Sequence, residues 1–244
     1  MLCSFSESMN IIVTGSSKGL GASLAQQLLA QGHSVVGISR TSSPPELKNH
    51  DKFYHFPIDL VEENSSEMVI QGLKRNDLVP NAIIFNAAKY DIKRDYAIPY
   101  LKAAGQLNFV HPIELVKALK MEFGEAPIVA VLISSVMIFF PDHLNYVYAS
   151  TKAGVSNAFT NLRWNSIYSN FRFKTFYLGP FDNSTIRKFV ENRSDVSKVA
   201  QYIIKSLSKP GHTYFFPNHY KLLCVLSRFV PDGLLISALK KFRR

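Results

Sequence analysis

Residues 9–21 read Met-Asn-Ile-Ile-Val-Thr-Gly-Ser-Ser-Lys-Gly-Leu-Gly. Asn10–Thr14 predicts a short apolar strand, and the glycines that follow it predict a turn that leads into a helix. The N–H groups at the start of such a helix are free to bind an anion, so the stretch predicts a phosphate-binding turn. Gly15 permits the tight turn, Gly19 lets a pyrophosphate approach the backbone, and Gly21 lets the helix and the strand pack closely. The other residues of this predicted turn are Ser17, Lys18 and Leu20.

Apolar runs recur along the chain and alternate with helix-like patterns, which is typical of a parallel sheet covered by helices. The further predicted strands cover residues 34–40, 53–60, 82–88, 128–133, 173–177 and 212–217. Helices are expected over residues 20–32, 65–76 and 194–207, with one or two more inside 96–123, interrupted near Gly105. The pattern predicts an α/β protein.

A second informative stretch runs from Ser134 to Lys152 and ends in Tyr148-Ala-Ser-Thr-Lys152. On a helix, residues four apart lie on one face, about one turn from each other. An ammonium beside a phenol favours the phenolate and lowers the phenol pKa from about 10, which suits acid–base catalysis. Ser135 follows the apolar run 128–133, and a hydroxyl at the carboxyl end of a strand opens into the ligand crevice of an α/β sheet.

Together these motifs resemble the classical short-chain dehydrogenase/reductase family over residues 10–218. The motifs that carry the resemblance are Thr14-Gly15-x-x-x-Gly19-x-Gly21, Asp59-Leu60, Asn86-Ala87-Ala88, Asn108, Ser135, Tyr148 with Lys152, and Pro180 with Thr185. The resemblance implies a three-layer doubly wound (Rossmann) fold with a mainly parallel seven-stranded sheet. Residues 1–218 are expected to form one catalytic domain, and residues 219–244 a basic amphipathic tail.

The same resemblance implies an oxidoreductase with four catalytic residues. Tyr148 is expected to act as the acid/base, and Ser135 to orient the substrate oxygen. Lys152 is expected to lower the Tyr148 pKa and to bond the nicotinamide ribose. Asn108 is expected to distort its helix and to hold a water molecule that links the lysine to solvent.

The cofactor residues follow from the family pattern, with two departures. Asp59 and Leu60 are expected beside the adenine ring, and Asn86 with Ala87 at the cofactor floor, where bracing of the sheet is an equal alternative for Asn86. Pro180 and Thr185 are expected near the nicotinamide. The departures are Ala88 and Phe181, which stand where the family normally has glycine.

The cofactor is expected to be NADP(H). The second strand ends in Ser39-Arg40 and has no carboxylate to bond a ribose 2′-hydroxyl. Arg40 can pair with a 2′-phosphate, and Lys18 adds a second cation in the glycine turn. The apolar and aromatic segment 136–145 lines the substrate side in the family, which implies a carbonyl/alcohol substrate with an apolar or aromatic body.

Composition limits the other functions. The 244 residues contain 47% hydrophobic and 19% charged residues, and the two cysteines, Cys3 and Cys224, indicate neither a disulfide framework nor a zinc site. No metal is predicted. No secretory signal or membrane span is seen, so a cytoplasmic location is expected. The net charge is +10, of which residues 219–244 hold +5, so the remainder is only mildly basic and gives no argument for nucleic-acid binding.

The tail 219–244 has two apolar groups with basic edges, separated by Pro231-Asp232-Gly233. Three interpretations stay open: packing on the domain or a partner subunit, closing the active site, or lying on an anionic membrane surface. The resemblance implies a homodimer or homotetramer. Two alternatives to the soluble oxidoreductase remain: a non-catalytic nucleotide-sensing or scaffold protein with this fold, and a peripheral membrane enzyme with a lipid-like substrate.

Overall fold

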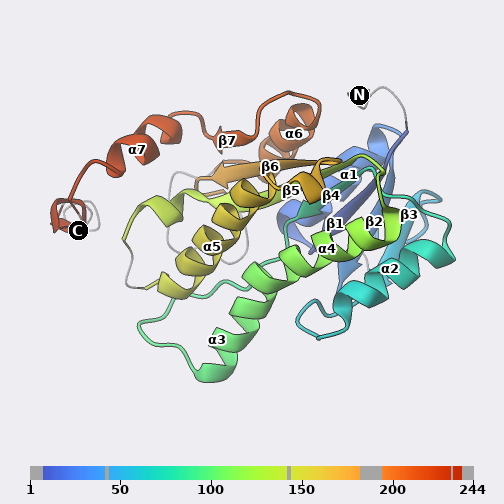
Figure 1. Cartoon of the computed structure of the whole chain (residues 1–244), viewed down its shortest axis with the longest axis horizontal. Helices are drawn as coiled ribbons and strands as arrows, with labels where there is room; N and C mark the ends of the chain where they lie inside the picture. The colour runs from blue at the N-terminus through green and yellow to red at the C-terminus, as the bar shows by residue number, and fades with distance from the viewer. Residues whose placement is uncertain (1–7, 42–43, 142–143, 182–193, 232, 238–244) are drawn as a thin grey trace.

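The chain folds around one seven-stranded sheet, seen in a computed structural model that describes residues 8–41, 44–141, 144–181, 194–231 and 233–237. The strand order is β3-β2-β1-β4-β5-β6-β7, and every pairing is parallel, as Figure 1 shows. The prediction of a doubly wound α/β fold is therefore confirmed. The strands are β1 (Asn10–Thr14), β2 (Ser34–Ser39), β3 (Phe53–Pro57), β4 (Ala82–Phe85), β5 (Ile128–Ser135), β6 (Phe171–Leu178) and β7 (Thr213–Phe216).

The chain reverses its direction of travel across the sheet between β1 and β4. From β1 it proceeds to β2 and β3 on one side, then returns to place β4 on the other side of β1. In open parallel sheets, ligands bind outside the carboxyl ends of the strands at such a switch point. The carboxyl ends of β1 to β6 carry most of the predicted site residues, and the others, Asn108, Tyr148 and Lys152, lie on helical segments.

Helices cover both faces of the sheet (Figure 1). One core cluster joins α1 and α6 to the sheet, and a second cluster joins α2, α4 and α5 to the opposite face. In β1, Ile11 and Val13 belong to the first cluster and Ile12 to the second, as the alternation of a strand requires. The helices are α1 (Gly19–Ala30), α2 (Ser65–Arg75), α3 (Ile98–Gly105), α4 (His111–Phe123), α5 (Tyr146–Leu162), α6 (Val196–Leu207) and α7 (Tyr220–Ser227).

A π-helical turn, Gln106–Val110, joins α3 to α4. The predicted interruption near Gly105 is therefore a widened turn within continuous helical backbone, because Gly105 and Gln106 keep right-handed helical angles. Single π-helical turns are frequent at functional sites. Here the turn contains Asn108, whose side chain is buried.

Lys174 of β6 is fully buried, which the sequence does not indicate. Its Nζ donates to the carbonyls of Ser206 and Gly211, both at 3.1 Å, and to the hydroxyl of Tyr214 at 3.1 Å. Burial lowers the pKa of Lys174 to about 7. The lysine thus ties the end of α6 and the start of β7 to the sheet.

The tail begins with α7, which lies at the end of the molecule away from α2 (Figure 1). Cys224 and Ser227 of α7 face the protein and are buried, whereas Leu222 and Phe229 are exposed. Among the described residues, no helix has the length and apolar character needed to cross a membrane.

Candidate active site

The glycine turn connects β1 to α1 and has the geometry that its sequence predicts. Gly15 has φ +70° and Gly19 has φ +57°, a region that favours glycine. A Cβ on Gly21 would lie 2.1 Å from the carbonyl oxygen of Gly15. Gly21 therefore allows the start of α1 to pack closely on the glycine turn. The space beside Gly19 is open, which leaves its backbone accessible.

The start of α1 is suited to an anion. Its first turn has no acidic side chain, and no side chain caps its N–H groups. These groups and the dipole of the helix can therefore bind a phosphate. Leu20 is buried beneath the turn, Ser17 is half-buried, and Lys18 is exposed.

The end of β2 brings Arg40 to the surface at the same edge of the sheet. Before it, Ser39 donates to the carbonyl of Thr41 at 2.9 Å and lies 2.9 Å from His55 Nε2. Burial lowers the pKa of His55, so this ring is neutral near pH 7. The exposed cations Lys18 and Arg40, with the free helix start, fit the phosphates of a nicotinamide dinucleotide.

Gly37 of β2 was missed in the sequence as a site residue. A Cβ on Gly37 would lie 2.7 Å from Ser16 Oγ and 2.6 Å from the Phe53 ring. A larger residue there would displace the glycine turn. The signal that could have revealed it is a lone glycine inside a predicted strand, which often marks close approach of another chain segment.

Thr14 and Asn86 connect the two strands at the switch point. The Thr14 hydroxyl accepts from the N–H groups of Asn86 and Ala87, both at 3.0 Å. Asn86 Nδ2 donates to the carbonyls of Thr14 at 3.0 Å and Gly15 at 3.3 Å. The side chain of Asn86 is thus a brace for the turn, which was one of its two predicted roles.

Ala88 does not strain the backbone. It is exposed, and among the described residues Asp77 alone combines a side chain with positive φ. The absence of the usual glycine therefore has little conformational cost. Asp59 Oδ1 accepts from Val61 N at 3.1 Å and shapes the turn after β3, while Leu60 is buried in the core below it.

Ser135 and Tyr148 meet at the end of β5. A hydrogen bond from Ser135 lowers the pKa of Tyr148, but burial is the larger effect and raises it above the usual value of a phenol. Tyr148 keeps part of its surface exposed, so a substrate can reach it. The ring of Tyr90 packs edge-on against Tyr148, with centroids 4.8 Å apart. No sequence motif indicated Tyr90.

Lys152 lies one turn after Tyr148 on α5 and is buried. Its Nζ donates to the carbonyl of Ile133 at 2.7 Å and lies 6.0 Å from the centre of the Tyr148 ring. Burial lowers the pKa of Lys152 to about 8. The pKa of Tyr148 is raised mainly by burial and further by Tyr90, and only the hydrogen bond from Ser135 lowers it. The lowering of this pKa by Lys152 stays a prediction.

Asn108 fixes α5 to the segment after β4. Its Oδ1 accepts from Lys89 N at 2.7 Å, and its Nδ2 donates to Lys89 O at 2.9 Å and to Thr151 Oγ1 at 3.1 Å. These three bonds use both hydrogens of the amide and one of the two lone pairs of Oδ1. The water molecule expected at Asn108 stays a prediction.

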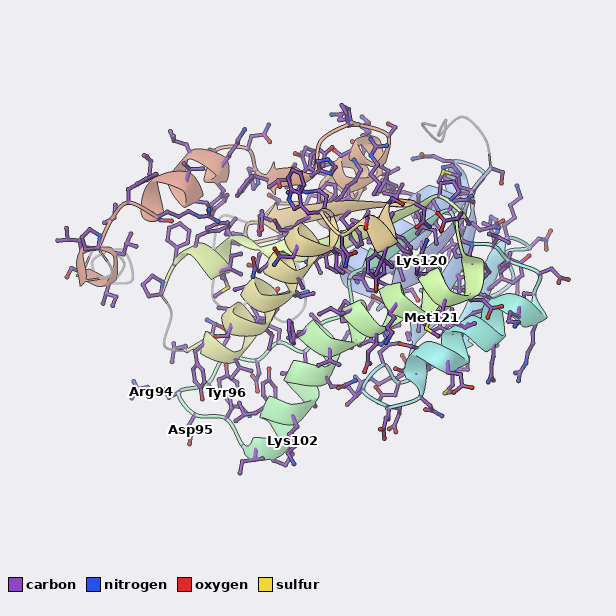
Figure 2. The ribbon with its side chains drawn as sticks, in the orientation of Figure 1. Arg94, Asp95, Tyr96, Lys102, Lys120 and Met121 are labelled. Atoms are coloured by element: carbon purple, nitrogen blue, oxygen red, sulfur yellow. The ribbon has the colours of Figure 1, made fainter. Side chains whose placement is uncertain are left out.

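Tyr96 makes a second connection between the same parts. Its hydroxyl donates to the carbonyl of Leu144 at 2.7 Å, and its ring packs against Tyr146 at the start of α5. Figure 2 shows Tyr96 on the loop before α3, close to the start of α5. The segment between β4 and α3 is therefore held against the catalytic helix at two points.

The end of β6 carries the remaining predicted cofactor residues. Pro180 accepts from Ser194 N at 3.1 Å, and Phe181 packs against the core cluster of α1 and α6. Thr185 lies outside the described residues. A Cβ on Gly179 would lie 2.5 Å from the Tyr220 ring, so glycine there admits the tail. Among the described residues, no three His, Cys, Asp or Glu side chains form a group able to hold a metal ion.

Comparison with known proteins gives one family match. The family model described as short chain dehydrogenase matches residues 9–194. The chain is 24% identical over 210 residues to 3-ketodihydrosphingosine reductase TSC10 of Yarrowia lipolytica, covering 77% of this chain and 56% of that protein. It is 31% identical over 120 residues to benzil reductase of Bacillus subtilis, covering 46% and 48% respectively. The chain thus spans about half the length of these relatives.

Solved structures share the fold. A short chain dehydrogenase from Burkholderia cenocepacia in complex with NADP superposes with a TM-score of 0.83 at 16% identity, covering 96% of this chain and 98% of that chain. A 4-hydroxyisoleucine dehydrogenase complexed with NADH and succinate gives a TM-score of 0.75 at 14% identity, covering 84% and 96%.

Proposed function

The chain belongs to the short-chain dehydrogenase family, and from that premise we propose that it is an NADP(H)-dependent oxidoreductase acting on a carbonyl/alcohol pair. The observation that carries the proposal is the hydrogen bond between Ser135 and Tyr148. Lys152 lies one helical turn after Tyr148, and the glycine turn lies at the same edge of the sheet. We assign this activity to a single catalytic domain over residues 1–218.

In the direction of reduction, each residue has a distinct task. The bound nicotinamide supplies the hydride. Tyr148 gives a proton to the developing alkoxide, and its raised pKa keeps that proton in place near neutral pH. The Ser135 hydroxyl orients the substrate oxygen. Lys152 is a buried cation one turn away, and Asn108 positions the helix that carries both residues.

The preference for NADP(H) rests on charge. Lys18 and Arg40 are both exposed at the cofactor edge of the sheet, and the end of β2 has no carboxylate that would repel a 2′-phosphate. An arginine can bind that phosphate through two parallel hydrogen bonds, whereas a 2′-hydroxyl offers it little. The remaining cofactor contacts are assigned to the glycine turn, Asp59, Leu60, Ala87, Ala88, Pro180 and Thr185.

We assign the substrate an apolar or aromatic body. Tyr90 stands beside the catalytic tyrosine, and the segment after Ser135 is apolar. Two relatives have names that specify reduction of benzil and of 3-ketodihydrosphingosine, which supports a ketone of this kind. A lipid-like substrate at a membrane surface is a second candidate, favoured by the exposed Leu222 and Phe229 of the tail. For an enzyme that acts on a soluble aromatic ketone, we propose a cytoplasmic location.

We also propose a homodimer or homotetramer paired through α5. Phe109, 38% exposed, packs on Gly154 of α5, and Leu101 is similarly exposed one helix earlier. An apolar face of this kind beside the catalytic helix suits a second copy of the chain. Size-exclusion chromatography with light scattering tests this point separately.

The activity is tested by titrating the protein with NADPH and with NADH while following nucleotide fluorescence. NADPH should bind more tightly, and Arg40→Ala should remove the preference by weakening NADPH alone. Arg75→Ala, an exposed arginine at the end of α2, is the control and should bind as wild type. Tyr148→Phe should abolish turnover of aromatic ketones and leave NADPH affinity nearly unchanged.

Two outcomes would oppose the proposal. Normal turnover by Tyr148→Phe would remove the tyrosine from the reaction. Failure of a cooperatively melting protein to bind either nucleotide would favour the non-catalytic scaffold alternative.

A further inference from the structure

A groove of about 540 Å³ lies between the tail and the second half of α5. Its volume is within the range of small-molecule sites in proteins, roughly 300–1,000 Å³. Its walls come from η2 (Val136–Phe139), from α5, from β6 and from the tail. The lining residues are Ile138, Phe139, Ala153, Ser156, Asn157, Thr160, Tyr177, Ser227, Arg228, Val230 and Leu235.

The groove is separate from the reacting position. Tyr148 does not line the groove. The lining of α5 begins at Ala153, five residues after Tyr148, which at 1.5 Å per residue is about 7.5 Å along the helix axis. A ligand in the groove would nevertheless touch η2, which directly follows Ser135, and Ser156, which donates to the carbonyl of Lys152 at 2.6 Å.

The groove has an apolar part and a polar part. Ile138, Val230 and Leu235 provide aliphatic surface from η2 and from the tail. On the other side, Ser156 forms a hydrogen bond with Tyr177, and burial raises the pKa of Tyr177. Tyr177 therefore keeps its proton near neutral pH and adds a polar but uncharged group to the lining. This division suits a ligand with an apolar body and a polar end.

Arg228 gives the polar part of the groove a positive charge. It is the charged residue of the lining, and its guanidinium lies 5.3 Å from the centre of the Phe139 ring. Within the part of the chain that the structure describes, no carboxylate forms an ion pair with Arg228. A guanidinium held over an aromatic ring, with no ion pair to any described carboxylate, is suited to bind an anionic group by charge-assisted hydrogen bonds.

We propose that this groove is a second ligand site that binds a single-chain anionic amphiphile, with its carboxylate at Arg228 and its chain against Ile138, Val230 and Leu235. The proposal gives the tail a role as the outer wall of a ligand site. It does not involve the residues assigned to the cofactor or the four assigned to catalysis, since none of them lines the groove. Ile138 and Phe139 of the lining belong to the apolar segment after Ser135, so the groove adjoins the substrate side.

The test is isothermal titration calorimetry of the full chain with dodecanoate, below its micelle concentration, and with dodecan-1-ol. Dodecanoate should bind more tightly than the alcohol. Arg228→Ala should weaken dodecanoate by about tenfold or more, because a hydrogen bond to a charged group contributes about 1.5–3 kcal/mol, and should leave the alcohol unchanged. Arg75→Ala is the matched control and should bind both as wild type.

A filling variant tests the location. Asn157→Trp places a large ring in the groove from an exposed position on α5, so the fold should tolerate it, and it should remove binding of both probes. Asn161→Trp, one turn further along and outside the lining, is its control. NADPH binding reports that each variant is folded.

Three results would overturn the proposal. They are no binding of dodecanoate by wild type, unchanged binding by Arg228→Ala, and unchanged binding by Asn157→Trp. If changing Leu222 and Phe229 to serine removed binding while Asn157→Trp kept it, the amphiphile would lie on the outer face of α7, and the groove would not be its site.

Discussion

Asn108→Ala should destabilise the protein far more than its single polar side chain suggests. Asn108 is 1% exposed, and its amide satisfies both backbone groups of Lys89 and contacts Thr151. Alanine leaves the N–H and C=O of Lys89 without these partners. An unsatisfied buried group costs about 1–3 kcal/mol, and Lys89 is only half-buried, so the expected loss is about 2–4 kcal/mol.

Thermal unfolding measures this loss directly. For a chain of this size, 1 kcal/mol shifts Tm by about 2–4 °C, so Tm should fall by about 5–15 °C. Asn161→Ala, an exposed asparagine on the catalytic helix α5, is the control and should stay within about 1 °C of wild type. An equally small shift in Asn108→Ala would show that the side chain does not hold α5 to the segment after β4.

Three further predictions follow from the same geometry. Since burial lowers the pKa of Lys152 to about 8, kcat/KM for carbonyl reduction should fall above that pH as the ammonium loses its proton, and Lys152→Arg should remove this inflection by staying charged. Gly21→Ala should lower Tm and weaken NADPH binding by about tenfold or more, since the new Cβ would lie 2.1 Å from a carbonyl oxygen. Gly105→Ala is the control: it has open space around it in a helix, so it should be neutral or slightly stabilising in the same assays. Lys174→Met should lower Tm by at least about 5 °C because the buried carbonyl of Ser206 and the partly buried carbonyl of Gly211 lose their donor, while exposed Lys205→Met should not. Equal melting of the two variants would contradict the buried role of Lys174.

The positions of most strands could be predicted because β1, β2, β4 and β5 are largely apolar runs bounded by turn residues, whereas the size of the sheet was implied by the resemblance to the family. Ser135 and Tyr148 could be predicted as partners because they end one strand and begin the following helix. The glycine turn could be predicted because positive φ and close backbone contact both demand glycine, and sequence records that demand directly.

Features that depend on tertiary contacts could not be predicted in this way. Thr14 and Lys89 form their hydrogen bonds with residues about 70 and 20 positions away in the sequence. No local sequence pattern indicates these partners. The burial of Lys174 is invisible because lysine is normally exposed. The rise of the Tyr148 pKa has the same origin, since burial depends on the packing around the phenol.

The position of β1 between β2 and β4 has a consequence for synthesis on the ribosome. β1 can pair with β2 as soon as both have emerged, but its other edge needs β4. β2 ends at Ser39 and β4 ends at Phe85, so at roughly 5–20 residues per second this edge waits about 2–9 s. During that time one edge of an apolar strand has free N–H and C=O groups, which can pair with other chains. We therefore expect the nascent chain to need a chaperone most before β4 has been synthesised.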